Sequence, residues 1–137
     1  MTGRVDRYTT PVFTVERIAP EVNLFRYCEG IVVNAALIEE SLRVRRELPG
    51  EKAYASVALF PSTATFDSDL FQKDLYRDER PDDFVKALAV VTEGGNLRDI
   101  ADLYYAEYPP FFKVRVFNAL ESALLWVQGI LDGRDLR

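Results

Sequence analysis

The run Ala53-Tyr54-Ala55-Ser56-Val57-Ala58-Leu59-Phe60 decides the fold, because nearly every position in it is apolar or small. A strand with one wet face alternates polar and apolar residues, whereas a strand covered on both faces does not. A second such run, Ala87-Leu88-Ala89-Val90-Val91, follows later in the chain. Two strands of this kind predict a central, largely parallel sheet with helices packed on it.

The segments before and after these runs extend the sheet. Apolar and polar side chains alternate from Val12 to Ile18, which is the period of a half-buried strand. Extended character resumes over residues 22–28 after a Pro-containing turn, so we expect an antiparallel hairpin or a neighbouring pair. Near the other end, Phe112, Val114 and Val116 alternate with charged residues, which indicates a strand with one wet face or an edge strand.

Capping residues mark the helices between these strands. Asn34 is a good N-cap for a helix that runs to Leu48, and the Pro-Gly pair that follows would end it. Asn96 and Asn118 each have an acidic residue three positions later, a variant of the capping box, and each is expected to open a helix. A further helical stretch is predicted near residues 70–76.

The order of elements predicts one α/β domain with a mixed, mostly parallel five-stranded sheet and about four helices. We expect residues 1–11 to form a flexible N-terminal arm, residues 12–131 the domain, and residues 132–137 a C-terminal tail. A chain of 137 residues is long enough to bury a core without disulfides or a metal.

Composition excludes much of the familiar catalytic apparatus. The chain has no histidine and one cysteine, Cys28, so it can build neither a Ser-His-Asp triad nor a thiolate metal cage. Cys28 falls in a predicted strand, where packing is its expected role. Paired carboxylates at residues 39–40 and 82–83 are adjacent in sequence and form no natural dyad. We therefore expect no metal, no cofactor and no enzymatic activity.

The charge and hydropathy pattern bears on partners and location. A formal net charge of -5 disfavours nucleic acid and anionic membrane as partners, because both require a basic surface. Neither an apolar signal segment nor an uncharged run long enough for a membrane helix is present in the sequence. Together with the single cysteine, this predicts a cytoplasmic protein.

Three segments carry a resemblance to a known family: Val44-Arg45-Arg46-Glu47-Leu48, residues 87–91, and Val114-Arg115-Val116-Phe117 followed by residues 121–127. Over residues 12–131 the element order resembles the STAS fold of bacterial anti-sigma-factor antagonists. The local sequence is similar to a group of small STAS-like bacterial proteins of uncharacterised function. The resemblance implies a protein-binding domain, in which a Ser or Thr at the start of the helix after the third strand is phosphorylated by a partner kinase.

The loop that matches this position contains four hydroxyl residues, Ser62, Thr63, Thr65 and Ser68, but lacks the family's Asp-Ser-Ser-Gly pattern. A phosphate there would add negative charge near a helix N-terminus and repel an acidic partner surface. In the alternative interpretation, Asp67 or Ser68 caps the helix while Ser62 and Thr63 satisfy a turn.

A second candidate site lies between a central strand and a helix, at Gly94, Gly95 and Asn96. Free backbone amides in such a position can hold an anion. The segment has neither a Walker lysine nor spaced dinucleotide glycines, and Glu93 precedes it, so a plain turn and cap is the alternative.

The third candidate is an aromatic surface patch. Five aromatic residues occur within residues 104–112, and one helix cannot bury them all. Tyr105 and Phe111 fall off the inward stripe, and Trp126 falls off the stripe of the last helix. We expect these three to form an interface for self-association, with a dimer favoured, or for partner docking, the alternative being simple core closure.

The sequence therefore predicts a non-catalytic regulatory or protein-interaction module with an unknown protein partner, modulated by Ser/Thr phosphorylation in the 62–68 loop. The alternative is a domain that binds a small apolar ligand or lipid, because related folds in lipid-transfer proteins hold apolar molecules and this chain has 7 Tyr and 9 Phe. The alternative predicts a pocket.

Overall fold

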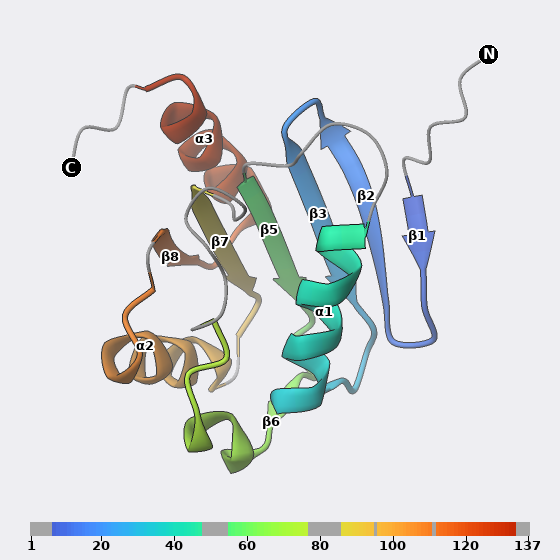
Figure 1. Cartoon of the computed structure of the whole chain (residues 1–137), viewed down its shortest axis with the longest axis vertical. Coiled ribbons are helices and arrows are strands. Elements are labelled where there is room, and N and C mark those ends of the chain that lie inside the picture. The colour runs from blue at the N-terminus through green and yellow to red at the C-terminus, as the bar shows by residue number, and fades with distance from the viewer. Residues whose placement is uncertain (1–6, 48–54, 77–85, 95, 111, 134–137) are drawn as a thin grey trace.

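The computed structural model describes residues 7–47, 55–76, 86–94, 96–110 and 112–133 (Figure 1). Its main sheet has six strands in the order β1-β2-β3-β5-β7-β8. Their bounds are Arg7–Thr9, Phe13–Ala19, Val22–Tyr27, Ala55–Phe60, Ala87–Thr92 and Lys113–Phe117. Strands β1, β2 and β3 pair antiparallel, and β3, β5, β7 and β8 pair parallel, so the sheet is mixed and mostly parallel as predicted. A separate parallel pair joins β4 (Val32–Val33) to β6 (Thr65–Phe66).

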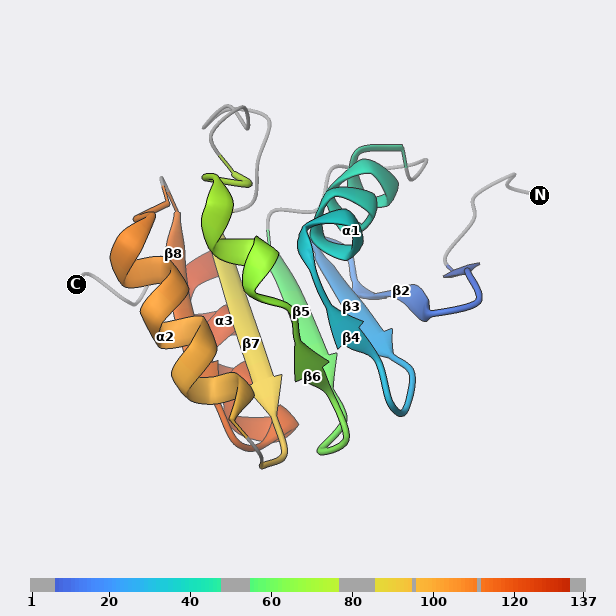
Figure 2. The same ribbon diagram turned by 90° about the horizontal axis from the view of Figure 1, so that it is seen from below.

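The helices cover the two faces of the main sheet unequally (Figure 2). Helices α1 (Ala35–Glu47) and α2 (Leu97–Glu107) lie on one face, together with the short 3-10 helix η1 (Ser68–Gln72). Helix α3 (Leu120–Leu131) lies on the other. Right-handed crossovers between strands that advance in one direction place all their connections on one face. The face with α1 and α2 therefore becomes the thicker layer.

Alternation along the strands divides the apolar side chains into two cores. The larger core contains Phe25 and Tyr27 of β3 and packs against α1 and α2. The smaller core contains Val57 of β5 and packs against Ala123 and Val127 of α3. Strands β5 and β7 contribute to both cores, which confirms that they are central strands covered on two sides.

The element count differs from the prediction. The described residues form six main-sheet strands and three α-helices, where five strands and about four helices were expected. The additional strand is β1, which lies within the predicted arm and pairs with β2 from Arg7↔Glu16 to Thr9↔Thr14. Its three residues are all exposed, so hydrophobic periodicity carried no signal for it.

The helix expected near residues 70–76 is only the five-residue η1. Asp67 caps it by accepting from the Asp69 N–H at 3.0 Å, and Lys73 ends it in an extended conformation. Side chains of α2 then bind the backbone that a longer helix would have paired internally: Tyr108 Oη donates to the Phe71 carbonyl at 2.8 Å. Tertiary contacts have replaced helical ones in this segment.

The predicted helix caps have three different outcomes. The cap predicted at Asn34 is confirmed, since Asn34 Oδ1 accepts a hydrogen bond from the Leu37 N–H at 2.8 Å. Asn96 precedes α2 but makes no side-chain capping bond. The prediction that Asn118 caps a helix is wrong, because the extended residue Ala119 occupies the N-cap of α3. Leu48, the predicted end of the first helix, lies outside the described residues.

Cys28 does not pack inside a strand as predicted. It is exposed, one residue beyond the end of β3. A tight turn follows it, in which the Ile31 N–H donates to the Cys28 carbonyl at 3.2 Å and Gly30 takes a φ of 73°. A left-handed φ favours glycine, which explains the residue type at position 30.

Candidate ligand cavity

A cavity of about 100 Å³ lies in the larger core, between α1, α2, the residues following η1 and one face of β3, β5 and β7. Its lining is mainly aliphatic and aromatic. The aromatic members are Phe25, Tyr27, Phe60, Tyr76, Tyr104 and Tyr105. Figure 2 shows α1 and α2 on either side of η1 across this face of the sheet.

One wall of the cavity is an aromatic stack from neighbouring parallel strands. Tyr27 and Phe60 lie with ring centroids 4.4 Å apart and planes inclined by 2°. Phe13 and Phe25 pack against Tyr27 from β2 and β3. These side chains occupy face positions of the sheet, so strand pairing fixes them and the wall is rigid.

The Tyr27 hydroxyl forms a buried hydrogen bond within the protein. It lies 2.8 Å from Ser41 Oγ, which donates to the Leu37 carbonyl at 2.9 Å, so the Tyr27 hydroxyl is the donor to Ser41. Burial raises the pKa of the Tyr27 phenol well above its usual range. At neutral pH this wall carries no charge.

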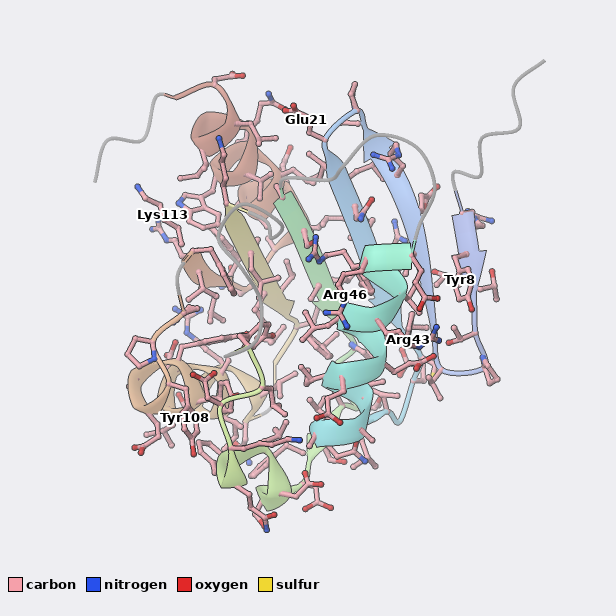
Figure 3. All side chains as sticks on the ribbon, viewed as in Figure 1. Tyr8, Glu21, Arg43, Arg46, Tyr108 and Lys113 are labelled. Atoms are coloured by element: carbon pink, nitrogen blue, oxygen red, sulfur yellow. The ribbon has the colours of Figure 1, made fainter. Side chains whose placement is uncertain are left out.

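The opposite wall is formed by tyrosines of α2 and the residues after η1. Tyr104 Oη accepts from the Leu75 N–H at 2.8 Å and donates to the Lys73 carbonyl at 3.2 Å. Burial raises the pKa of Tyr104 to about 12. The Tyr76 and Tyr105 hydroxyls lie 3.0 Å apart, and burial likewise raises the pKa of Tyr105. Figure 3 shows Tyr108 where α2 meets η1.

Polar side chains gather at one end of the same sheet face. Strand register places Arg17, Asn23 and Ser56 side by side on β2, β3 and β5. Asn23 is 1% exposed and Ser56 5% exposed, and within the described structure neither Asn23 Oδ1 nor Ser56 Oγ has a hydrogen-bond partner. Of these three residues, Ser56 belongs to the cavity lining.

The cavity lining also includes one cationic side chain. Arg45 of α1 is 8% exposed and lines the cavity together with Ser56, and no acidic side chain belongs to the described lining. Sequence reasoning assigned no role to Arg45. A signal was present, because Ser41 and Arg45 are four residues apart and therefore share one face of the helix.

The four loop hydroxyls lie away from this cavity. Ser62, Thr63, Thr65 and Ser68 are all exposed. Thr63 Oγ1 accepts from the Gly30 N–H and donates to Glu29, both at 2.7 Å, so it ties two loops together. Asp67 caps η1, as the alternative interpretation of the loop expects, whereas the printed bonds of Thr63 reach another loop and not a local turn.

The second candidate site is only partly visible. Gly94 has a φ of 127° and is exposed, Asn96 is exposed at the start of α2, and Gly95 lies outside the described residues. At Gly94 and Asn96, the two members that the structure describes, nothing points to a bound anion beyond the helix terminus itself.

The two described members of the predicted interface, Tyr105 and Trp126, pack against different cores. Tyr105 is partly buried against the larger core and lines the cavity. Trp126 is partly buried against the smaller core, with its ring 5.6 Å from that of Phe117. Phe111 lies outside the described residues.

Other kinds of site find little support. The described residues hold no group of three or more His, Cys, Asp or Glu side chains placed to bind a metal. None of the helices in the described ranges has the length and apolar character needed to cross a bilayer. Comparisons with protein-family models, with curated proteins and with solved structures find no match for the chain.

Proposed function

We propose that this α/β domain binds a small, largely apolar molecule in the cavity between α1, α2 and the sheet. The observation that carries the proposal is a cavity of about 100 Å³ with aromatic walls in the larger core. Protein interiors are close-packed, with few voids larger than a water molecule. An apolar cavity with a few polar groups is the usual form of a small-molecule site.

The hydroxyls of the walls support binding rather than chemistry. Tyr27 and Tyr104 are each held by hydrogen bonds within the protein, and their raised pKa values keep them neutral at physiological pH. A neutral, internally bonded phenol is a rigid surface, and it is a poor general base. The walls therefore favour an apolar ligand held by shape.

A matched pair of variants tests this proposal. Ala101 of α2 lines the cavity, whereas Ala106 of the same helix is exposed. We expect benzene and isovaleramide, two small neutral probes, to raise the melting temperature of the wild type and of Ala106→Leu in proportion to the logarithm of concentration. Ala101→Leu should lose this response, because the added side chain fills the space. Equal responses in the two variants, or none in the wild type, would contradict the proposal.

A role in protein interaction is a second proposal, and the exposure of Ser62, Thr65 and Ser68 supports it. Intact-mass analysis of the protein from its native host, with a lysate pull-down before and after phosphatase treatment, tests it. We expect a mass increase of one phosphate and a partner whose capture depends on that phosphate. A single unmodified mass with no phosphatase-sensitive partner would remove the proposal.

The STAS-like relationship, the dimer and the cytoplasmic location also stay predictions. Light scattering measures the assembly directly, and a strictly monomeric protein would contradict the interface expected at Tyr105, Phe111 and Trp126. Fractionation of the native host tests the location.

A further inference from the structure

One hydroxyl in the cavity lining indicates the chemistry of the ligand. Resting on the proposed function, we infer that the cavity takes a small neutral alcohol, with the hydroxyl of the ligand at Ser56 and its hydrocarbon against the aromatic walls. Ser56 is the second residue of β5 and belongs to the lining.

The hydrogen bonding of Ser56 supplies the first argument. Ser56 is buried on a central strand, and its Oγ has no hydrogen-bond partner within the described structure. A buried hydroxyl without a partner is unfavourable, because it has lost its water and gained nothing in exchange. The other hydroxyls of the described lining are bonded within the protein, namely those of Tyr27, Ser41, Tyr76, Tyr104 and Tyr105. In this lining, Ser56 is therefore the hydroxyl that a ligand can complete.

The change of polarity along β5 supplies the second argument. Strand alternation places Ser56, Ala58 and Phe60 on one face of β5, and all three line the cavity. Ala58 and Phe60 offer only hydrocarbon, and the Phe60 ring stacks on that of Tyr27. A ligand that lies along β5 would therefore meet a hydrogen-bonding partner at one end and an apolar wall at the other. A compact hydrocarbon with one terminal hydroxyl has this polarity.

An alcohol also matches Ser56 and the cavity in bonding and in size. Serine has one O–H donor and two acceptor lone pairs, and an alcohol has the same set, so the two groups can pair in either direction. Rotation about the Cα–Cβ bond moves the Ser56 hydroxyl among staggered positions and lets it meet the ligand. Because a dry cavity of roughly 150 Å³ accepts benzene, a cavity of about 100 Å³ limits the ligand to about four to six non-hydrogen atoms.

Cyclopentanol and chlorocyclopentane provide the test, because they have nearly the same shape and differ in hydrogen bonding. NMR titration of the full chain gives both dissociation constants, and the constant for the chloride divided by that for the alcohol measures the contribution of the hydroxyl. We expect Ser56→Ala to lower this ratio roughly fivefold, since only the alcohol loses a partner. Ser122→Ala removes an exposed hydroxyl from α3, on the opposite face of the sheet, and should leave the ratio unchanged.

The stability of Ser56→Ala gives a second measurement. Because the variant removes a buried hydroxyl without a partner, its urea midpoint should be no lower than that of the wild type. A clearly lower midpoint would mean that the hydroxyl is already paired, and it would overturn the alcohol assignment.

The two proposals fail in different ways. If the wild type binds both probes and Ser56→Ala leaves the ratio unchanged, the alcohol assignment is overturned and the proposed function stays intact. If the wild type binds neither probe, the assignment and the proposed cavity function both fail.

Discussion

The role of a single residue can be predicted from the sequence when its contacts lie within a few positions along the chain, and not when they depend on tertiary packing. Asn34 was identified as an N-cap from its position before a periodic apolar segment, and its Oδ1 makes the capping bond. A cap depends on neighbours within three residues, so the sequence contains the required information. Arg45 and Ser56 were missed as cavity-lining residues because the cavity forms only when elements far apart in the sequence pack together, and no local pattern encodes that packing.

The two asparagines before helices give a prediction at this scale. Asn34→Ala should lower the free energy of unfolding by ~1 kcal/mol, because the Leu37 N–H loses its acceptor. Asn96→Ala should cost clearly less, since Asn96 makes no side-chain capping bond. Urea denaturation of both variants measures the difference. Equal losses would show that the Asn34 bond contributes no stability.

At the scale of elements, the main strands and the helices α1, α2 and α3 were predicted close to their observed positions. Their apolar periodicity and length gave strong signals, as in the six buried residues of β7. The segment up to Tyr76 was predicted to be helical but is helical only over Ser68–Gln72, because hydrogen bonds from Tyr104 and Tyr108 determine its path. Contacts between residues about 30 positions apart leave no local trace in the sequence.

These tyrosines give a prediction about how η1 is attached to α2. Tyr104→Phe should destabilise the fold by about 1–3 kcal/mol, because the buried Leu75 N–H loses its partner. Tyr108→Phe should cost less, since it removes one donor from the Phe71 carbonyl in a partly buried contact. Hydrogen exchange across residues 68–76, read together with urea denaturation, measures both effects. Unchanged exchange in Tyr104→Phe would refute this account of the attachment.

At the scale of the whole molecule, the order of strands and helices was sufficient to predict a mixed, mostly parallel sheet with helices packed on it. The cavity could not be predicted, because it is the space that remains when several helices and strands pack together, and a side chain one methylene larger in any of them would change it. The abundance of Tyr and Phe indicated a pocket in general terms but gave no location.

The buried phenols give a pH dependence for the whole protein. The folded-state pKa of Tyr104, at about 12, lies above the ordinary value of 10.0, and those of Tyr27 and Tyr105 are raised in the same direction. Their contribution to stability is therefore complete below about pH 10 and is lost as the pH rises toward 12. We expect the free energy of unfolding to fall by ~1 kcal/mol per pH unit for each such phenol in this range.

Urea titrations at several alkaline pH values measure this slope. Tyr27→Phe should flatten it, since the variant has one fewer buried phenol to ionise. A wild-type stability that stays constant from about pH 10 to pH 12 would show that these phenols ionise as readily in the folded protein as in the unfolded chain.

The main-sheet strands lie side by side in the order in which they are synthesised. During translation each new strand can therefore dock onto the previous one, and the sheet can grow at a single edge while the polypeptide leaves the ribosome. Until Lys113–Phe117 has emerged, the apolar β7 remains an open edge that can pair with another nascent chain. Completion of the C-terminal region is thus the step that protects the newborn protein from aggregation.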